Sequence, residues 1–292
     1  MAVARFVRHV LLAVQFFTRI PVTGRLADWV GYSPAMLRAS AAHFPAIGWL
    51  VGTPVALCFA GLCWALPAQP ATPWVAAIFS TLLGVMLTGA FHEDGLADVA
   101  DGLGGSMNRE RALDIMKDSR VGSYGALALV VALLAKVATL ALLGQIAPGL
   151  AACALLAAHV SSRTVPLFII RTLPHVGDTA QSKSKPLADQ VSGAALAVAL
   201  VWWLPVLGWT LAPLLCATPP AWLGGLGASP TIWGLGWLLA WGMALLTLLL
   251  AWGWLWRLFA RRLQGFTGDC LGTTQQVCEI AFYLGLALAW RG

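Results

Sequence analysis

Four carboxylates stand close together where the second long apolar run of the chain ends. Glu93, Asp94, Asp98 and Asp101 fall within nine residues, in the sequence FHEDGLADVADG. If this stretch is helical, Asp94, Asp98 and Asp101 occupy positions i, i+4 and i+7 and share one face. Like charges on one face repel each other, so the pattern indicates a bound cation. Oxygen ligands favour a hard divalent metal, and we expect Mg²⁺.

The stretch that follows predicts a hairpin. A glycine-rich bend at residues 102–105 precedes residues 108–118, which have the apolar spacing of a short amphipathic helix. The hairpin would return Asp114 and Asp118 toward the first acids. Neighbouring side chains, those of Lys117, Ser119 and Arg120, are donors suited to phosphate oxygens. We therefore predict a catalytic loop at about residues 92–124.

Phosphoryl transfer is the chemistry that this pattern favours. Metal ions held by carboxylates can bridge a pyrophosphate, neutralise the leaving phosphate and orient an attacking hydroxyl. The alternative is a solvated loop with ordinary intrahelical charge pairs, which remains open above all for Asp114. Two further positions are candidates: Asp269 in the glycine-rich turn GFTGDCLG, and Arg163 inside an apolar run. An arginine there is costly unless it pairs or faces a wet cavity, so it is treated as a functional candidate.

The composition places these residues in a polytopic, all-α integral membrane protein. Of the 292 residues, 59% are hydrophobic and only 10% are charged, far from the roughly 25% charged residues of soluble domains. A basic, amphipathic N-terminal segment, residues 3–20, is expected to lie in the membrane interface, with an eighth span as the alternative. We predict seven transmembrane helices, at residues 40–66, 74–91, 125–146, 149–172, 190–216, 231–256 and 275–290.

The charges alternate between the loops and so predict an orientation. Four segments, residues 1–39, 92–121, 171–189 and 257–274, contain 15 of the 18 Lys and Arg residues. The rule that basic loops stay inside places these segments, and the catalytic loop, in the cytoplasm. Anionic membrane lipid next to such loops accounts for the net charge of +6, and no nucleic-acid patch is expected. No linker or repeat is visible, so we expect one domain over residues 1–292.

These residues resemble the cobalamin synthase family of adenosylcobinamide-GDP ribazoletransferases. HEDGLADVADG is similar to the family signature H-x-D-G-L-A-D-x-x-D-G, and IMKDSRVGSYG is similar to a second family block. FFTRIPV, FPAIGWLVG, the Ser162-Arg163 pair and GFTGDCLG occur in the family's order, so the resemblance covers nearly the whole chain. The chain departs from the pattern at two positions: Glu93 replaces an apolar residue and Asp114 replaces Glu.

The resemblance implies a reaction that completes cobalamin. The hydroxyl of α-ribazole, or of its 5′-phosphate, would attack the cobinamide phosphate of adenosylcobinamide-GDP and release GMP, with Mg²⁺ assistance, at the inner membrane. A complex with other corrinoid-pathway enzymes is compatible with it. The implied metal ligands are Asp94, Asp98, Asp101, Asp114 and Asp118. The implied catalytic residues are Asp269 and Lys117, and substrate would be bound by Ser119, Arg120, Arg163, Thr267 and Gly268.

Two other functions remain open from the sequence. A CDP-alcohol phosphotransferase would run similar chemistry at a membrane, but the D-G-x-x-A-R spacing of that family is absent because Asp98 has a different offset. A cation transporter would place its ionisable residues near the bilayer midplane on paired, broken helices. Here the acids lie at the end of a span, which disfavours transport.

Overall fold

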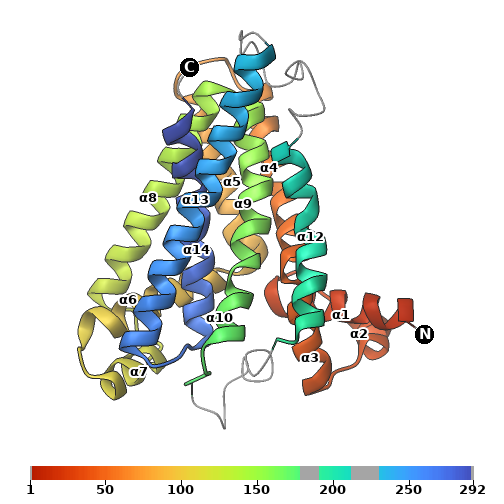
Figure 1. Ribbon diagram of the computed structural model, residues 1–292, viewed down its shortest axis with the longest axis vertical. Coiled ribbons are helices and arrows are strands. Elements are labelled where there is room, and N and C mark those ends of the chain that lie inside the picture. Colours follow the sequence, from red (N-terminus) through yellow and green to blue (C-terminus); the bar gives the residue numbers. More distant parts are fainter. Residues whose placement is uncertain (1, 178–190, 212–229, 291–292) are drawn as a thin grey trace.

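The protein is a bundle of helices (Figure 1). The computed structural model describes residues 2–177, 191–211 and 230–290, and in these residues helices are joined by short turns, with one isolated bridge between His175 and Phe266. The helices are α1 (Ala2–Phe17), α2 (Gly24–Val30), α3 (Pro34–Ser40), η1 (Ala41–His43), α4 (Phe44–Ala65), α5 (Thr72–Thr88), α6 (Phe91–Gly105), α7 (Arg109–Lys117), α8 (Ser123–Ile146), α9 (Pro148–Thr164), α10 (Pro166–Thr172), α12 (Gly193–Leu211), α13 (Pro230–Arg262) and α14 (Gly268–Ala289).

The all-α, polytopic membrane fold predicted from the sequence is confirmed. Among the described residues, five helical segments are long and apolar enough to cross a membrane, at residues 34–65, 123–146, 148–172, 193–211 and 234–262. The bent pair α5 and α6 would make a sixth. The predicted count of seven also needs α14, a helix of 22 residues, and it stays a prediction. Residues 212–216 of the fifth predicted span lie outside the described residues.

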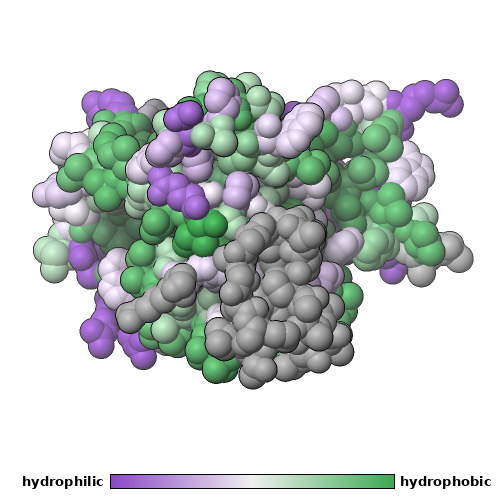
Figure 2. Space-filling model, turned by 90° about the horizontal axis from the view of Figure 1, so that it is seen from above, coloured by the Kyte–Doolittle hydropathy of each residue, from purple (hydrophilic) through white to green (hydrophobic). Residues whose placement is uncertain are grey.

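The two ends of the bundle differ in character. Figure 1 places α1–α3, α6, α7 and α10 at its lower end, and these elements carry most of the charged residues. Seen from the upper end, hydrophobic residues cover much of the face that is not grey, and hydrophilic residues are most frequent toward the outline (Figure 2). The charge asymmetry predicted from the loops is therefore present in the structure.

Helix α9 is largely buried within the bundle, and two glycines of α4 let that helix approach it closely. A Cβ atom added at Gly48 of α4 would lie 2.5 Å from the carbonyl oxygen of His159, and one at Gly52 would lie 3.0 Å from the Cβ of His159. Spacing of this kind, with small residues four apart, is typical of tightly packed membrane helices. The close crossing fixes His159 in the interior, at 3% exposure.

A sharp bend separates α5 from α6. Gly89 and Ala90 both adopt left-handed backbone conformations, with φ of 67° and 59°, and the two helices meet at 89°. Such a conformation costs a non-glycine residue about 1 kcal/mol, so the surrounding structure must enforce it at Ala90. As a result, α6 does not continue the direction of α5 but turns away from it at the charged end of the bundle.

Candidate active site

The predicted hairpin of acidic helices is present. Helix α6 contains the four acids and α7 follows it after a short turn, with Ala112 and Met116 of α7 buried. Two arginines fix the hairpin to the end of α13: Arg109 Nε donates to the carbonyl of Leu263 at 2.6 Å, and Arg262 donates to the carbonyl of Ser106 at 2.7 Å. The hairpin is therefore held against the bundle.

The close packing of α6 on α14 brings Asp269 to the acidic helix. Gly95 faces the backbone of Asp269, where an added Cβ atom would lie 2.8 Å from the Asp269 carbonyl oxygen. The hydroxyl of Thr273 donates to the carbonyl of Gly95 at 3.0 Å and joins the two helices. Thr267 caps the start of α14 by accepting from the Cys270 amide, and its hydroxyl donates to Asp269 Oδ2 at 3.2 Å. Gly268, half-buried, begins α14 beside it.

We define the acid cluster as Asp94, Asp98 and Asp269. Asp94 is exposed, whereas Asp98 and Asp269 are half-buried. Burial raises the pKa of Asp98 to about 7, and the charges of Asp269, Asp94 and Asp101 add to this effect. The pKa of Asp269 is also raised, mainly by burial, although the Thr267 hydrogen bond opposes it. In the described part of the chain no Lys or Arg forms an ion pair with these three acids, so no described basic side chain neutralises their negative charge.

Asp101 lies on the same side of α6 but has a different partner. Its two carboxylate oxygens accept hydrogen bonds from the amides of Gly122 at 2.7 Å and Gly125 at 2.8 Å, at the start of α8. These amides belong to the first turn of a helix, where backbone N–H groups have no intrahelical acceptor. Side chains at residues 122 and 125 would collide with the carboxylate. Asp101 therefore joins α6 to α8, and its assignment as a metal ligand stays a prediction.

The acids of α7 are not gathered with the acid cluster. Asp114 is exposed, and Asp118 accepts from Arg120 Nε at 2.9 Å. Hydrogen bonds from Arg120 lower the pKa of Asp118 to about 2. Lys117 and Ser119 are exposed beside this pair. Across the described residues, no three His, Cys, Asp or Glu side chains form a ready-made metal site, so the five-carboxylate ligand set predicted from the sequence stays a prediction.

Arg163 lies inside the bundle and is 1% exposed. Its guanidinium contacts His159 Nδ1 at 2.8 Å and donates to the His159 carbonyl at 3.1 Å, and it lies 6.0 Å from the centre of the Phe44 ring. The sequence indicated that an arginine here must pair or face a wet cavity, and the structure shows it hydrogen-bonded to His159. Direct contact between Arg163 and substrate stays a prediction.

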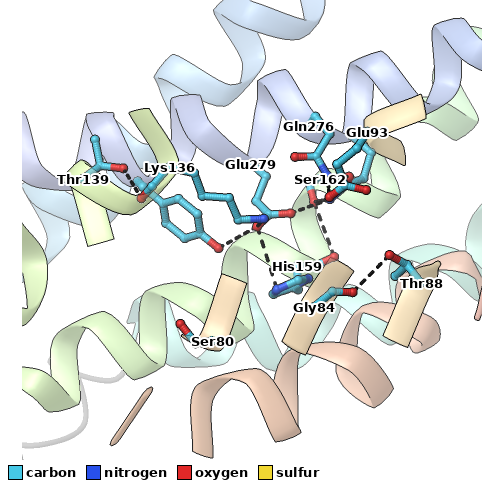
Figure 3. Close-up of polar contacts among 12 residues, drawn as sticks. Ser80, Gly84, Thr88, Glu93, Lys136, Thr139, His159, Ser162, Gln276 and Glu279 are labelled. Atoms are coloured by element: carbon cyan, nitrogen blue, oxygen red, sulfur yellow. Dashed lines mark hydrogen bonds and ion pairs between the residues drawn. The ribbon is translucent and has the colours of Figure 1, made fainter. Parts of the chain in front are cut away.

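A buried ion pair lies at the centre of the polar interior. Lys136 Nζ lies 2.6 Å from Glu279 Oε1, and the Tyr283 hydroxyl donates to the same oxygen at 2.9 Å. The ring of His159 is 3.8 Å from it. Figure 3 shows the side chains of Lys136, Glu279 and His159 pointing toward one another from three helices. Lys136 of α8 is thereby paired with a carboxylate of α14.

Two glutamines extend this network to the acidic helix. Gln276 donates to Glu93 Oε1 at 2.9 Å and to Gln275 Oε1 at 3.0 Å, while Gln275 donates to Glu279 and to Ser162 (Figure 3). Glu93, whose role the sequence left unassigned, therefore points away from the acid cluster into the bundle. We call Glu93, Lys136, Arg163 and Glu279, with the polar groups that join them, the buried network; its two acids and two bases balance in charge.

The comparisons with known proteins agree with the motifs. The family model for cobalamin-5-phosphate synthase matches residues 9–287. The chain belongs to this family. It is 60% identical over 285 residues to the adenosylcobinamide-GDP ribazoletransferase of Albidiferax ferrireducens, covering 98% of this chain and 99% of the relative. It is 41% identical to that of Shewanella amazonensis, over 96% of this chain and 95% of the relative. No solved structure matches the chain.

In this member of the cobalamin-5-phosphate synthase family, the chemistry of the acid cluster fits a divalent cation. All of its donors are carboxylate oxygens, the ligand type that Mg²⁺ prefers. Burial and, in addition, the neighbouring carboxylates raise the pKa of Asp98, and a bound cation would favour its charged form. Zinc sites usually include nitrogen or sulfur ligands, and these three residues supply neither.

Several residues of the site could not be assigned from the sequence. Gln275, Gln276 and Tyr283 join the network only because α14 packs against α6, α8 and α9. The available signal was polar residues within an apolar segment, which default to a functional or structural role in membranes. Their partners lie far away in the chain, so spacing could not reveal them.

Proposed function

We propose that this protein transfers the cobinamide phosphate of adenosylcobinamide-GDP to α-ribazole or its 5′-phosphate. The acceptor hydroxyl forms a bond to the phosphorus attached to cobinamide, and the bond between that phosphorus and the bridging oxygen of the diphosphate breaks. GMP leaves with that oxygen, and the hydroxyl proton passes to a base. The observation that carries the proposal is the acid cluster, three carboxylates with no counter-charge among the described residues, in a chain of this family.

Each residue at the site has a role in this proposal. Asp94 and Asp98 would hold Mg²⁺, which supplies charge neutralisation for the diphosphate when it is bound. Asp269 takes the hydroxyl proton, because burial raises its pKa and so makes it a better base. Lys117 and Arg120 are exposed beside the hairpin, where their cationic groups can bind phosphate oxygens.

The orientation of the protein is part of the same proposal. The charged end of the bundle carries the acid cluster, and the excess of basic residues there favours the cytoplasmic side of the inner membrane. Both substrates are polar and would reach the site from the cytoplasm. Segment α1, with its basic residues, would then lie in the interface beside lipid headgroups.

The test measures GMP release by the full-length protein in membranes, with adenosylcobinamide-GDP, α-ribazole and Mg²⁺. We expect stoichiometric GMP and cobalamin, abolished by EDTA and by Asp94→Asn. Asp28→Asn is the matched control, because Asp28 is an exposed acid on α2 outside the cluster. Release of CMP from CDP-linked lipids in place of GMP release would refute the proposal.

A further inference from the structure

A large cavity lies at the charged end of the bundle, away from the acid cluster. Its volume is about 760 Å³, and it is bounded by α1, α3, η1, α10 and the start of α12. This is within the range of roughly 300–1,000 Å³ that small-molecule sites occupy. Among the described residues that line it none is acidic, and five are basic or histidine, namely Arg5, Arg38, Arg171, His9 and His43. We call it the basic cavity.

The arginines of the basic cavity have no carboxylate partner among the residues that the structure describes. In the part of the chain that the structure describes, no carboxylate pairs with Arg5, Arg38 or Arg171. Arg171 donates one hydrogen bond, to the carbonyl of Val191 at 3.2 Å. The pKa of His9 is lowered by burial and by Arg5 and Arg8, so this ring is neutral at pH 7. The charge therefore comes from the three arginines.

His43 adds a fixed hydrogen-bond donor to the wall. The ring is 3% exposed, and its Nδ1 accepts from the indole nitrogen of Trp202 at 3.1 Å. A neutral ring that accepts at Nδ1 must carry its proton on Nε2, which is then a donor. Phe6 packs edge-on against His43 at 4.9 Å and stacks on Trp202 at 6.2 Å. These contacts hold the donor in place between α1 and α12.

The start of α12 supplies further positive potential. Gly193 and Ala194 line the cavity, and their amides belong to the first turn, where N–H groups have no intrahelical acceptor. The hydroxyl of Ser192 satisfies only the amide of Ala195, at 3.1 Å. The N-terminal end of a helix of 19 residues carries a partial positive charge that attracts anions.

We propose that the basic cavity is a second binding site, which holds the phosphate group of a nucleotide monoester or of an acidic lipid headgroup. Arginines bind phosphate oxygens through paired, charge-assisted hydrogen bonds, and three of them line this cavity with no carboxylate among its described lining residues. A phosphate anion would be repelled by the acid cluster, whose charge is negative in the absence of metal. The site goes beyond the proposed function, because it needs neither the acid cluster nor Mg²⁺.

The first experiment measures binding by the purified full-length protein in neutral detergent with EDTA. Isothermal titration compares α-ribazole 5′-phosphate with α-ribazole, which lacks only the phosphate. We expect the phosphate to strengthen binding at least tenfold, and Arg38→Gln and Arg5→Gln each to remove about tenfold of that gain. Arg25→Gln is the control, since Arg25 is an exposed arginine of α2 that does not line the cavity.

The second experiment tests the lipid source. Native mass spectrometry counts the phosphatidylglycerol molecules retained by the protein from nanodiscs that contain phosphatidylglycerol and phosphatidylcholine. If a lipid headgroup is the ligand, wild type and Arg25→Gln should retain a bound phosphatidylglycerol, whereas Arg5→Gln and Arg38→Gln should lose it. In that case α-ribazole 5′-phosphate should bind no more tightly than α-ribazole. Arg38→Lys keeps the charge and should retain most of the binding in either case.

The proposal is overturned if neither ligand distinguishes the cavity variants from Arg25→Gln. Arg5 is exposed on α1, so its substitution tests the site even if changes at Arg38 prevent folding. Because the readout is binding in EDTA, it is independent of turnover. Loss of GMP release with intact phosphate binding would count against the proposed function alone.

Discussion

Helix α6 carries residues of both the acid cluster and the buried network, but the charges of these two groups are compensated differently. Glu93 points into the bundle, where Gln276 donates to it and Lys136 and Arg163 balance the two acids. Asp94, one residue later, lies with Asp98 and Asp269 at the charged end, and no Lys or Arg of the described residues forms an ion pair with these acids. The formal charges of the buried network therefore balance one another, whereas those of the acid cluster have no counter-charge among the described residues.

The largest change in stability is expected for substitution of Lys136 in the buried network. Lys136→Met leaves Glu279 as an uncompensated charge within the bundle, which should lower the free energy of unfolding by about 3–5 kcal/mol. Thermal unfolding in detergent measures the change, with Arg257→Met, at an exposed site at the end of α13, as control. The double variant Lys136→Met/Glu279→Gln should recover most of the loss. A single variant as stable as wild type would show that the pair is not buried as described.

Removing a charge from the acid cluster should have the opposite effect and increase stability. Asp98→Asn removes a repelled carboxylate, so without metal it should stabilise the fold by about 1 kcal/mol, a figure that allows for solvent screening of this half-buried group. In the same variant, Mg²⁺ should no longer raise the melting temperature. If Asp98→Asn destabilised the metal-free protein, the description of the cluster as uncompensated would be wrong.

The pH dependence of folding stability is a further test of the acid cluster. The pKa of Asp98 is raised in the folded protein from its ordinary 3.8 to about 7, so between these values the folded state binds more protons than the unfolded state. Stability without metal should therefore fall as the pH rises from about 4 to 7 and level off above it. Melting temperatures across this range test the prediction. Saturating Mg²⁺ or Asp98→Asn should reduce the slope, and an unchanged slope would contradict it.

The smallest effect is expected at Asp118. Its pair with Arg120 is exposed, and solvent screens such pairs, so Asp118→Asn should barely change the melting temperature. GMP release is the informative readout. If Asp118 is a metal ligand, as the sequence pattern predicts, activity should fall with the Mg²⁺ dependence shifted to higher concentration. Unchanged activity would restrict the metal site to α6 and α14.

Much of the fold could be predicted from local sequence patterns. Apolar runs and loop charges predicted the helices of the bundle and its charged end, and the spacing of Ala112 and Met116 predicted the amphipathic helix α7. These features depend on residues close together in sequence. The bend at Gly89 and Ala90 was not predicted, because nothing about Ala90 alone requires a left-handed conformation.

The site could be predicted only in part, because its contacts cross the bundle. The sequence grouped Asp101 with Asp94 and Asp98 by helical spacing, but the amides that Asp101 binds lie 21 and 24 residues away. Likewise, Glu93 accepts a hydrogen bond from Gln276, which lies 183 residues later in the chain. Helical spacing shows which face a carboxylate occupies, and the packing of distant helices decides what that face meets.

The most direct test of the uncompensated acid cluster is the binding of Mn²⁺, a spectroscopic substitute for Mg²⁺, measured by electron paramagnetic resonance on the purified full-length protein. We predict that wild type and Asp28→Asn bind Mn²⁺ that Mg²⁺ displaces. We predict that the double variant Asp94→Asn/Asp98→Asn does not bind Mn²⁺. Its melting temperature is measured alongside to establish that the variant is folded. Equal binding by all three proteins would contradict the assignment of this cluster as the metal site.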